Sequence, residues 1–217
     1  MTSKPLFVIN FKAYENSCGA AASQLAKQIE EVAKIKGVSV IICVPATEIS
    51  RISGTVKIPV YAQHVDAMDY GKYTGWLPAK LAKAAGAKGT LVNHSEHRVG
   101  DDVEKIVSSA KEAGLDVIVC ARDATEVKIL RNLPADFIAV EPPELIASDI
   151  SIATGEPELI THSVKHCPDR LLAGAGVRTH ADVLKSKELG AKGVILSSEV
   201  MKSKNVKETL LQLFGGW

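Results

Sequence analysis

The chain has 217 residues, 46% of them hydrophobic, and carries 26 Lys and Arg against 25 Asp and Glu. This length suits one sizeable core, and the balanced charge, with no basic stripe, argues against a nucleic-acid or anionic-membrane partner. The longest apolar runs are about seven residues, far short of the roughly 20 that span a bilayer. Asn10 and Lys12 interrupt the N-terminal apolar run, so the sequence predicts no signal peptide.

The four cysteines have no C-x-x-C spacing, and Cys43 and Cys120 lie within apolar runs. This arrangement is typical of reduced cysteines in the core of a cytosolic protein. We therefore expect a cytoplasmic location.

Eight short apolar runs predict β-strands. They are nearly continuous in apolar residues rather than alternating, which is typical of parallel strands covered on both faces. In chain order the predicted strands are 6–11, 38–44, 59–64, 89–93, 116–121, 136–141, 171–175 and 193–197. Amphipathic segments between them predict helices over 20–36, 77–85, 102–113, 124–132, 157–166, 180–189 and 205–214, while 46–53 is ambiguous. Gly37 is the expected end of the first helix.

No linker or low-complexity tract divides the chain, so residues 1–217 are predicted to form one domain. Strands that alternate with helices in this way favour an α/β fold, a single-domain (β/α)8 barrel. The alternative is an open doubly wound sheet, but the G-x-G-x-x-G that usually follows its first strand is replaced here by "NFKAY". "GAKGTLVNHS" (86–95) and "GAKGVILSSE" (190–199) indicate either a half-barrel repeat or simply favourable loop chemistry.

Polar residues follow the carboxyl ends of the predicted strands, where such a barrel carries its functional groups. Asn10, Lys12, His94 and Glu141 are among them. A Lys and a Glu at the ends of buried strands are costly unless they are paired or used, so their convergence on one rim indicates a site. His94 opens a helical turn, which favours the neutral imidazole. We predict no metal site, because His94 and His97 lack a third ligand.

Two further strand ends, "AGAGV" (173–177) and "LSSEV" (196–200), are built from small residues. Their backbone N–H groups are able to approach an anion. The residues concerned are Gly174, Ala175, Gly176, Ser197 and Ser198. Small residues also fit a crowded barrel rim, so these motifs are weak alone.

Taken together, the motifs resemble the triosephosphate isomerase family, particularly its short archaeal members. They are "NFKxY" (10–14), "AQHVD" (62–66), "YTG" (73–75), "NHSEHR" (93–98), "AVEPPELI" (139–146) and "GAGV" (174–177), in the family's order over essentially the whole chain. The resemblance implies an aldose–ketose isomerase of glycolysis and gluconeogenesis. Such an enzyme interconverts D-glyceraldehyde 3-phosphate and dihydroxyacetone phosphate through an enediol(ate), without a cofactor.

The resemblance also implies roles. Glu141 matches the catalytic base and His94 the neutral electrophile, a pairing for which this family is itself the standard example. Lys12, with Asn10 beside it, matches the cation that attracts the phosphate, and Glu96 the carboxylate that supports Lys12. Ala147 and the small residues of 174–176 and 197–198 then face the phosphate.

Pro142 and Pro143 stiffen the start of the segment that forms a lid in the family. Beyond them the match fails: where the family usually reads Gly-Thr-Gly, this chain has Ala147, Ser148 and Asp149. A carboxylate about 4 Å from a phosphate charge costs about 1 kcal/mol in water-like surroundings and about 4 kcal/mol near a protein surface.

Glu199 adds a second carboxylate where archaeal members commonly have Gly, and we expect it to point to solvent. The two added acids leave open a different function, a weakly active or silent barrel that binds a phosphorylated ligand. Another phosphosugar isomerase is a third option, against which the pairing of "NHSEHR" with "AVEPPELI" argues.

The resemblance further implies a homodimer, with a homotetramer as the alternative. The "YTG" loop corresponds to the family's interface loop, and Tyr70, Tyr73 and Trp76 give it aromatic bulk suited to an interface.

Overall fold

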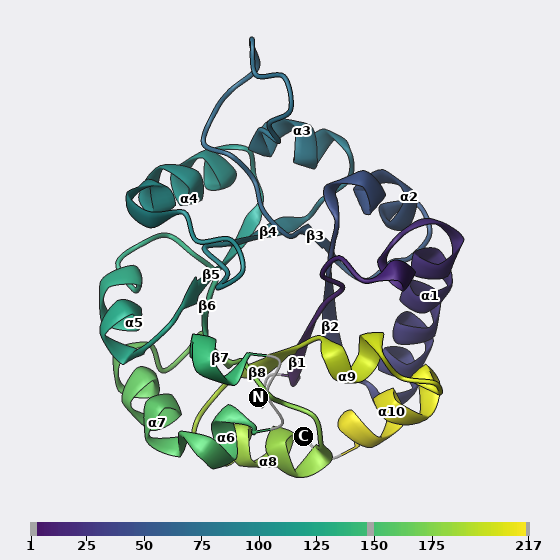
Figure 1. The fold of residues 1–217 in the computed structure, drawn as a ribbon, viewed down its shortest axis with the longest axis vertical. Coiled ribbons are helices and arrows are strands. Elements are labelled where there is room, and N and C mark those ends of the chain that lie inside the picture. The colour runs from purple at the N-terminus through teal and green to yellow at the C-terminus, as the bar shows by residue number, and fades with distance from the viewer. Residues whose placement is uncertain (1–3, 147–149, 216–217) are drawn as a thin grey trace.

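The computed structural model describes residues 4–146 and 150–215, so Ala147, Ser148 and Asp149 lie outside the described residues. Eight parallel strands form a closed barrel in sequence order, and Figure 1 shows them inside a ring of helices. The first strand pairs with the last, which rules out the open-sheet alternative. The strands are β1 (Leu6–Asn10), β2 (Ser39–Val44), β3 (Val60–Ala62), β4 (Gly89–Val92), β5 (Asp116–Ala121), β6 (Phe137–Val140), β7 (Leu171–Ala173) and β8 (Gly193–Leu196).

Seven helices match the predicted segments: α1 (Gly19–Lys36), α3 (Ala79–Ala84), α4 (Val103–Glu112), α5 (Ala124–Leu130), α7 (Pro157–His166), α8 (His180–Glu188) and α10 (Val206–Leu213). The ambiguous segment 46–53 contains a further short helix, α2 (Ile49–Ser53). Gly37 ends α1 with a φ of 67°, as expected. Two short helices, α6 (Ile152–Gly155) and α9 (Ser198–Met201), were not among the predicted ones. Single 3-10 turns are η1 (Glu15–Ser17), η2 (Ala46–Glu48), η3 (Gly100–Asp102) and η4 (Pro143–Leu145). Within the described ranges, no helix has the length and apolar character needed to cross a membrane.

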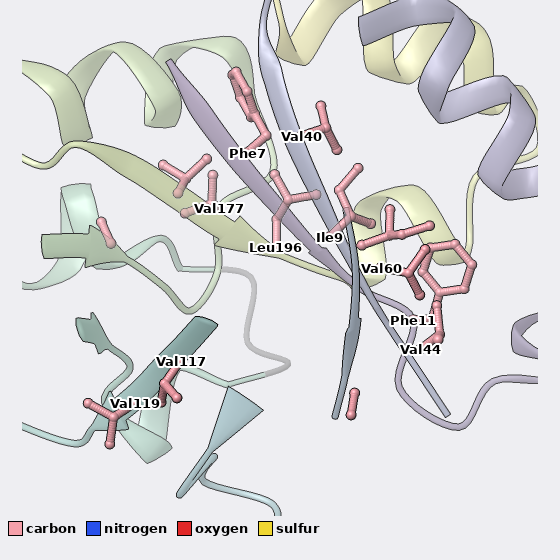
Figure 2. Packing of buried hydrophobic residues seen from close by; sticks show 14 of the residues in the cluster. Phe7, Ile9, Phe11, Val40, Val44, Val60, Val117, Val119, Val177 and Leu196 are labelled. Atoms are coloured by element: carbon pink, nitrogen blue, oxygen red, sulfur yellow. The ribbon is translucent and has the colours of Figure 1, made fainter. Parts of the chain in front are cut away.

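The two faces of each strand pack into two separate clusters, because successive side chains of a strand point to opposite faces. The outward side chains lie under the helices, as Figure 2 shows for Ile9 and Leu196. The inward side chains, among them Val8, Ile41 and Ile118, fill the barrel. Both faces are therefore apolar, which explains the continuous apolar runs in the sequence.

The repeated "GAKG" motif has a local explanation at both places. Gly86 and Gly190 have φ values of 106° and 100°, a conformation that favours glycine. Gly193 starts β8, where a Cβ would lie only 2.2 Å from the backbone oxygen of Leu6, and Gly89 at the start of β4 is similarly crowded. These contacts support the loop-chemistry interpretation, and the half-barrel repeat stays a prediction.

Three of the four cysteines, Cys43, Cys120 and Cys167, are buried as free thiols. The prediction of reduced core cysteines therefore holds for these three. Cys18 is also free but exposed, at the start of α1.

Replacing Asp123 with Ala should destabilise the barrel by about 1 kcal/mol. The Asp123 side chain caps α5 by accepting a hydrogen bond of 2.8 Å from the backbone N–H of Glu126. Asp123→Asn is the matched control, because Asn caps helices equally well. Urea unfolding compares the two variants, and equal stability of both would contradict the capping role.

Candidate active site

One pocket at the carboxyl ends of the strands gathers residues from five of the eight predicted strand ends or the turns after them. Of the predicted site, it is lined by Asn10, Lys12, His94, Glu141, Ala175, Gly176, Ser197 and Ser198. Glu96 lines an adjoining cavity that also touches Asn10, Lys12 and His94. The sequence-predicted residues thus converge on one rim of the barrel.

Glu141 continues the inward-facing row of β6, two residues beyond Ala139. Its backbone N–H donates to the Ala121 oxygen at 2.8 Å, which fixes the start of the loop. Its side chain is buried, and Oε2 has no hydrogen-bond partner among the described residues. A buried carboxylate oxygen without a hydrogen-bond partner costs free energy. Oε2 of Glu141 is therefore free to accept a hydrogen bond from a bound molecule.

Cys120, on the neighbouring strand β5, is a buried thiol affected by the same carboxylate. Burial and the charge of Glu141 raise the pKa of the Cys120 thiol well above its usual value. The thiol therefore stays protonated and adds no second negative charge beside Glu141.

His94 faces Glu141, with 3.7 Å between its Nε2 and Glu141 Oε2. Its other ring nitrogen, Nδ1, accepts a hydrogen bond of 3.1 Å from the backbone N–H of Glu96. An accepting Nδ1 carries no hydrogen, so the hydrogen of a neutral ring lies on Nε2. The turn after β4 thus selects a neutral imidazole that presents a donor to the pocket.

Lys12 has a left-handed backbone, with a φ of 48°, which is uncommon for residues other than glycine. Two side chains hold it there: Asn10 Oδ1 accepts from its N–H at 3.0 Å, and Gln63 Nε2 donates to its oxygen at 3.0 Å. Its Nζ donates to Glu96 Oε1 at 2.6 Å. Three partners, from the end of β1 and the turns after β3 and β4, therefore hold Lys12 and its ammonium group at the rim.

The loop after β7 differs in part from the expectation. The N–H of Gly174 donates to the Val140 oxygen at 2.9 Å, so this amide is engaged in the sheet rather than facing an anion. Gly174 instead makes room for Glu141, because a Cβ would lie 2.4 Å from Glu141 Cγ. Ala175 and Gly176 line the pocket with φ values of 75° and 65°.

Ser197 and Ser198, which follow β8, form another wall of the pocket. Ser197 Oγ is buried without a hydrogen-bond partner in the described part of the chain. Ser198 begins α9, and the first amides of a helix lack an intrahelical acceptor. Both serines therefore offer donors to the pocket.

Residues 150–152 pack on the loop after β7. The N–H of Ile152 donates to the Ala175 oxygen at 3.1 Å, and a Cβ on Gly176 would lie 2.0 Å from the oxygen of Ile150. On the other side of the gap, Ile146 lines the pocket directly after η4, which begins at Pro143. Ile146 thus lines the pocket, and residues 150–152 pack on the pocket-lining Ala175 and Gly176.

Glu199 does not face the pocket as an isolated acid. Its Oε2 lies 3.2 Å from Arg178 Nε in an ion pair, with a third of its side chain exposed. The expectation that it points to solvent is therefore only partly met, and its charge is compensated.

His64 and His97 pack on each other, with ring centroids 4.3 Å apart. His64 Nε2 also lies 3.1 Å from Asp66 Oδ1, and burial lowers the pKa of His64. Among the described residues, no group of three His, Cys, Asp or Glu could hold a metal ion.

Several residues of this site were missed as site residues, among them Val177, Ile195 and Leu196, which line the pocket. Tyr14 and Ile146 line the pocket, and Gln63 holds Lys12. Gln63 carried a usable signal, since it follows Tyr61 by two residues and therefore continues an inward row. Ile146 gave no such signal, because its sequence position resembles that of any apolar residue in a loop.

Replacing Gly174 with Ala should lower kcat by about 100-fold, because displacing a reacting group by about 1 Å has an effect of this size. Overpacking against Glu141 and Ile195 should also cost about 1–3 kcal/mol of stability. Gly54→Ala is the matched control, since its Cβ would meet nothing closer than 3.5 Å. Steady-state rates and thermal unfolding test this. Full activity in Gly174→Ala would contradict the packing argument.

The fold and the pocket together define a class of protein: a (β/α)8 barrel with a pocket of ionisable side chains at the carboxyl ends of its strands. Carboxylate, neutral imidazole and ammonium face one small cavity, with small-residue loops on its far side. The comparisons with known proteins identify the family.

The family model of triosephosphate isomerase matches residues 5–213. Triosephosphate isomerase of Sulfurisphaera tokodaii is 45% identical over 204 residues, covering 92% of this chain and 89% of that protein. The protein of the same name from Archaeoglobus fulgidus is 43% identical over 221 residues, covering 99% of both. The chain therefore belongs to the triosephosphate isomerase family. The resemblance to archaeal members and the prediction of an isomerase are confirmed.

A crystal structure of triosephosphate isomerase from Bartonella henselae superposes with a TM-score of 0.73 at 23% identity, covering 98% of this chain and 100% of that one. At this identity the likeness supports the fold alone. It agrees with the predicted barrel.

Proposed function

We propose that the protein interconverts D-glyceraldehyde 3-phosphate and dihydroxyacetone phosphate at the rim pocket. The observation that carries the proposal is the 3.7 Å between Glu141 Oε2 and His94 Nε2, two groups that face one cavity from different strands. A base and a donor at this separation reach neighbouring carbons of a three-carbon substrate. The membership of the family supports the same substrate pair.

In the proposed reaction, the Glu141 carboxylate takes a proton from the carbon next to the carbonyl. The Nε2–H of His94 donates to the carbonyl oxygen as negative charge develops there. The Lys12 ammonium stabilises the enediolate. Glu141 returns its proton to the neighbouring carbon, while His94 passes the proton of the neighbouring hydroxyl to the former carbonyl oxygen. Only protons move, so the reaction needs no cofactor.

The phosphate group is proposed to lie against Ala175, Gly176, Ser197 and Ser198. The backbone N–H groups of these loops carry partial positive charge, and the Ser197 hydroxyl is buried without a hydrogen-bond partner in the described chain. Both kinds of donor suit an anion. The remaining predicted contact, Ala147, lies outside the described residues. Water exclusion by the segment that follows Pro143 would protect the enediolate and strengthen the electrostatics of the pocket.

A coupled assay on the purified protein tests the proposal. It should show turnover of both triose phosphates in opposite directions, without added cofactor or metal. Absence of turnover would overturn the proposal.

The alternative function, a weakly active or inactive barrel that binds a phosphorylated ligand, was suggested by the two added acids. One of them, Glu199, is paired with Arg178, which weakens that argument. Calorimetry with a phosphorylated enediolate mimic separates the two functions. We expect tight binding, as is typical of transition-state-like ligands. A failure to bind would favour the alternative.

We further propose that the protein is a cytoplasmic homodimer whose interface includes the loop 67–76. Figure 1 shows the chain between β3 and α3 projecting beyond the ring of helices. Its base is closed by the mutual hydrogen bonds of Asp66 and Leu77, while Tyr73 and Trp76 are exposed. A projecting loop with a hydrogen-bonded base and exposed aromatic side chains is well suited to an interface.

Light scattering at micromolar concentration should give the mass of a dimer, and Trp76→Ser should shift it towards the monomer. Ile35→Ser on α1 is the matched control, because Ile35 is equally exposed but lies away from this loop. A monomer for the unchanged chain would contradict the proposal, whereas a tetramer would select the other predicted assembly.

A further inference from the structure

A second cavity, of about 830 Å³, opens at the amino ends of the strands, the end of the barrel opposite the rim pocket. Small-molecule sites typically have about 300–1,000 Å³. Its walls come from the starts of β1, β2, β3, β5, β6 and β8. None of the residues placed at the rim pocket lines it. It is therefore a separate cavity on the same barrel.

The floor of this cavity is apolar. Leu6, Ile41 and Tyr61 belong to the cluster that fills the barrel, and Phe137 packs against it while remaining partly exposed. These side chains form the layer of the barrel interior nearest the amino ends of the strands. A flat apolar group can therefore pack on them.

Three lysines, Lys4, Lys57 and Lys192, line the same cavity. Within residues 4–146 and 150–215, no carboxylate pairs with any of their ammonium groups, whereas Lys80 and Lys111 each pair with an aspartate. Unpaired ammonium groups around one cavity attract an anion.

Two carboxylates lie among the lysines. Asp116 Oδ2 accepts a hydrogen bond of 3.1 Å from the Tyr61 hydroxyl, and Asp169 lines the cavity as well. Three ammonium groups against two carboxylates leave a net charge of +1 on the described lining. A fitting ligand thus carries an anionic group, an apolar flat part and hydrogen-bond donors such as hydroxyls or an amine.

We propose that this cavity binds a nucleoside phosphate. The base packs on Leu6, Ile41 and Phe137, and the phosphate lies against the lysines. The hydroxyl or amine donors of the nucleoside face Asp116 and Asp169. The proposal is independent of the isomerase reaction, because the two cavities have no lining residue in common.

Calorimetry with adenosine 5′-monophosphate as the probe tests this on the full chain. The nucleotide should bind, while adenosine and inorganic phosphate, each lacking one half of the ligand, should bind at least about tenfold more weakly. Lys57→Glu and Lys192→Glu should each weaken nucleotide binding about tenfold or more. Lys128→Glu on α5 makes the same charge change outside the cavity and should leave binding unchanged.

Lys12→Met distinguishes this cavity from the rim pocket, and nucleotide binding should persist in that variant. Circular dichroism shows whether each variant is folded. No binding by the unchanged chain, loss of binding in Lys12→Met, or equal binding by Lys57→Glu, Lys192→Glu and Lys128→Glu would each overturn the proposal. Absence of isomerase activity in the unchanged chain, with nucleotide binding retained, would count against the proposed function only.

Discussion

Glu141→Gln should lower kcat by about 10²–10⁴-fold, the range for removal of a general base. Gln keeps the size of the side chain but cannot take a proton from carbon. The fold should tolerate the change, because the variant removes a buried charge whose Oε2 has no hydrogen-bond partner in the described chain. The coupled assay and a thermal unfolding curve measure both effects.

Glu144→Gln is the control for this variant. Glu144 lies three residues further along, in η4, and its side chain is exposed. Its kcat should equal that of the unchanged protein. Turnover by Glu141→Gln at the level of Glu144→Gln would show that another group takes the proton.

Lys12→Met should lower kcat/KM by about a thousandfold. Two unit charges about 4 Å apart interact by about 4 kcal/mol near a protein surface, which corresponds to nearly three powers of ten in rate. Met keeps the unbranched apolar stem of Lys12 without its ammonium group, and leaves Glu96 without its partner at 2.6 Å. The loss should fall on KM as well as kcat, since both the phosphate and the enediolate are negative.

Two further variants separate the causes of that loss. Lys80→Met removes a surface lysine that is also paired, with Asp69 at 2.7 Å, and should leave the rate unchanged. Lys12→Met combined with Glu96→Gln removes the stranded carboxylate. If the double variant recovered full activity, repulsion by Glu96 rather than loss of the cation would be the cause.

The barrel could be predicted because its strands are apolar on both faces and its helices are amphipathic. All eight strands lie inside their predicted ranges, and α1 begins one residue early and ends as predicted at Gly37. The helices α6 and α9 were missed because a helix of four residues is too short to show periodicity. Their position depends on the loops beneath them, which a local pattern does not contain.

The convergence of the site could be predicted from strand ends alone, but its supporting contacts could not. Asn10 and Glu141 stand in inward rows, so their direction follows from the alternation of a strand. The left-handed turn of Lys12 and the engaged amide of Gly174 depend on partners more than 30 residues away. Such pairings arise only once the barrel has closed.

The four groups proposed for the chemistry come from both halves of a closed ring. A fragment ending near Gly114 would contain Asn10, Lys12 and His94 without a base, and the remaining fragment would contain Glu141 alone. Neither fragment alone should be active. A mixture of the two should regain turnover only when β4 pairs with β5 and β8 pairs with β1. Catalysis in such a complementation experiment would thus serve as a sensitive gauge of how completely the halves reassemble.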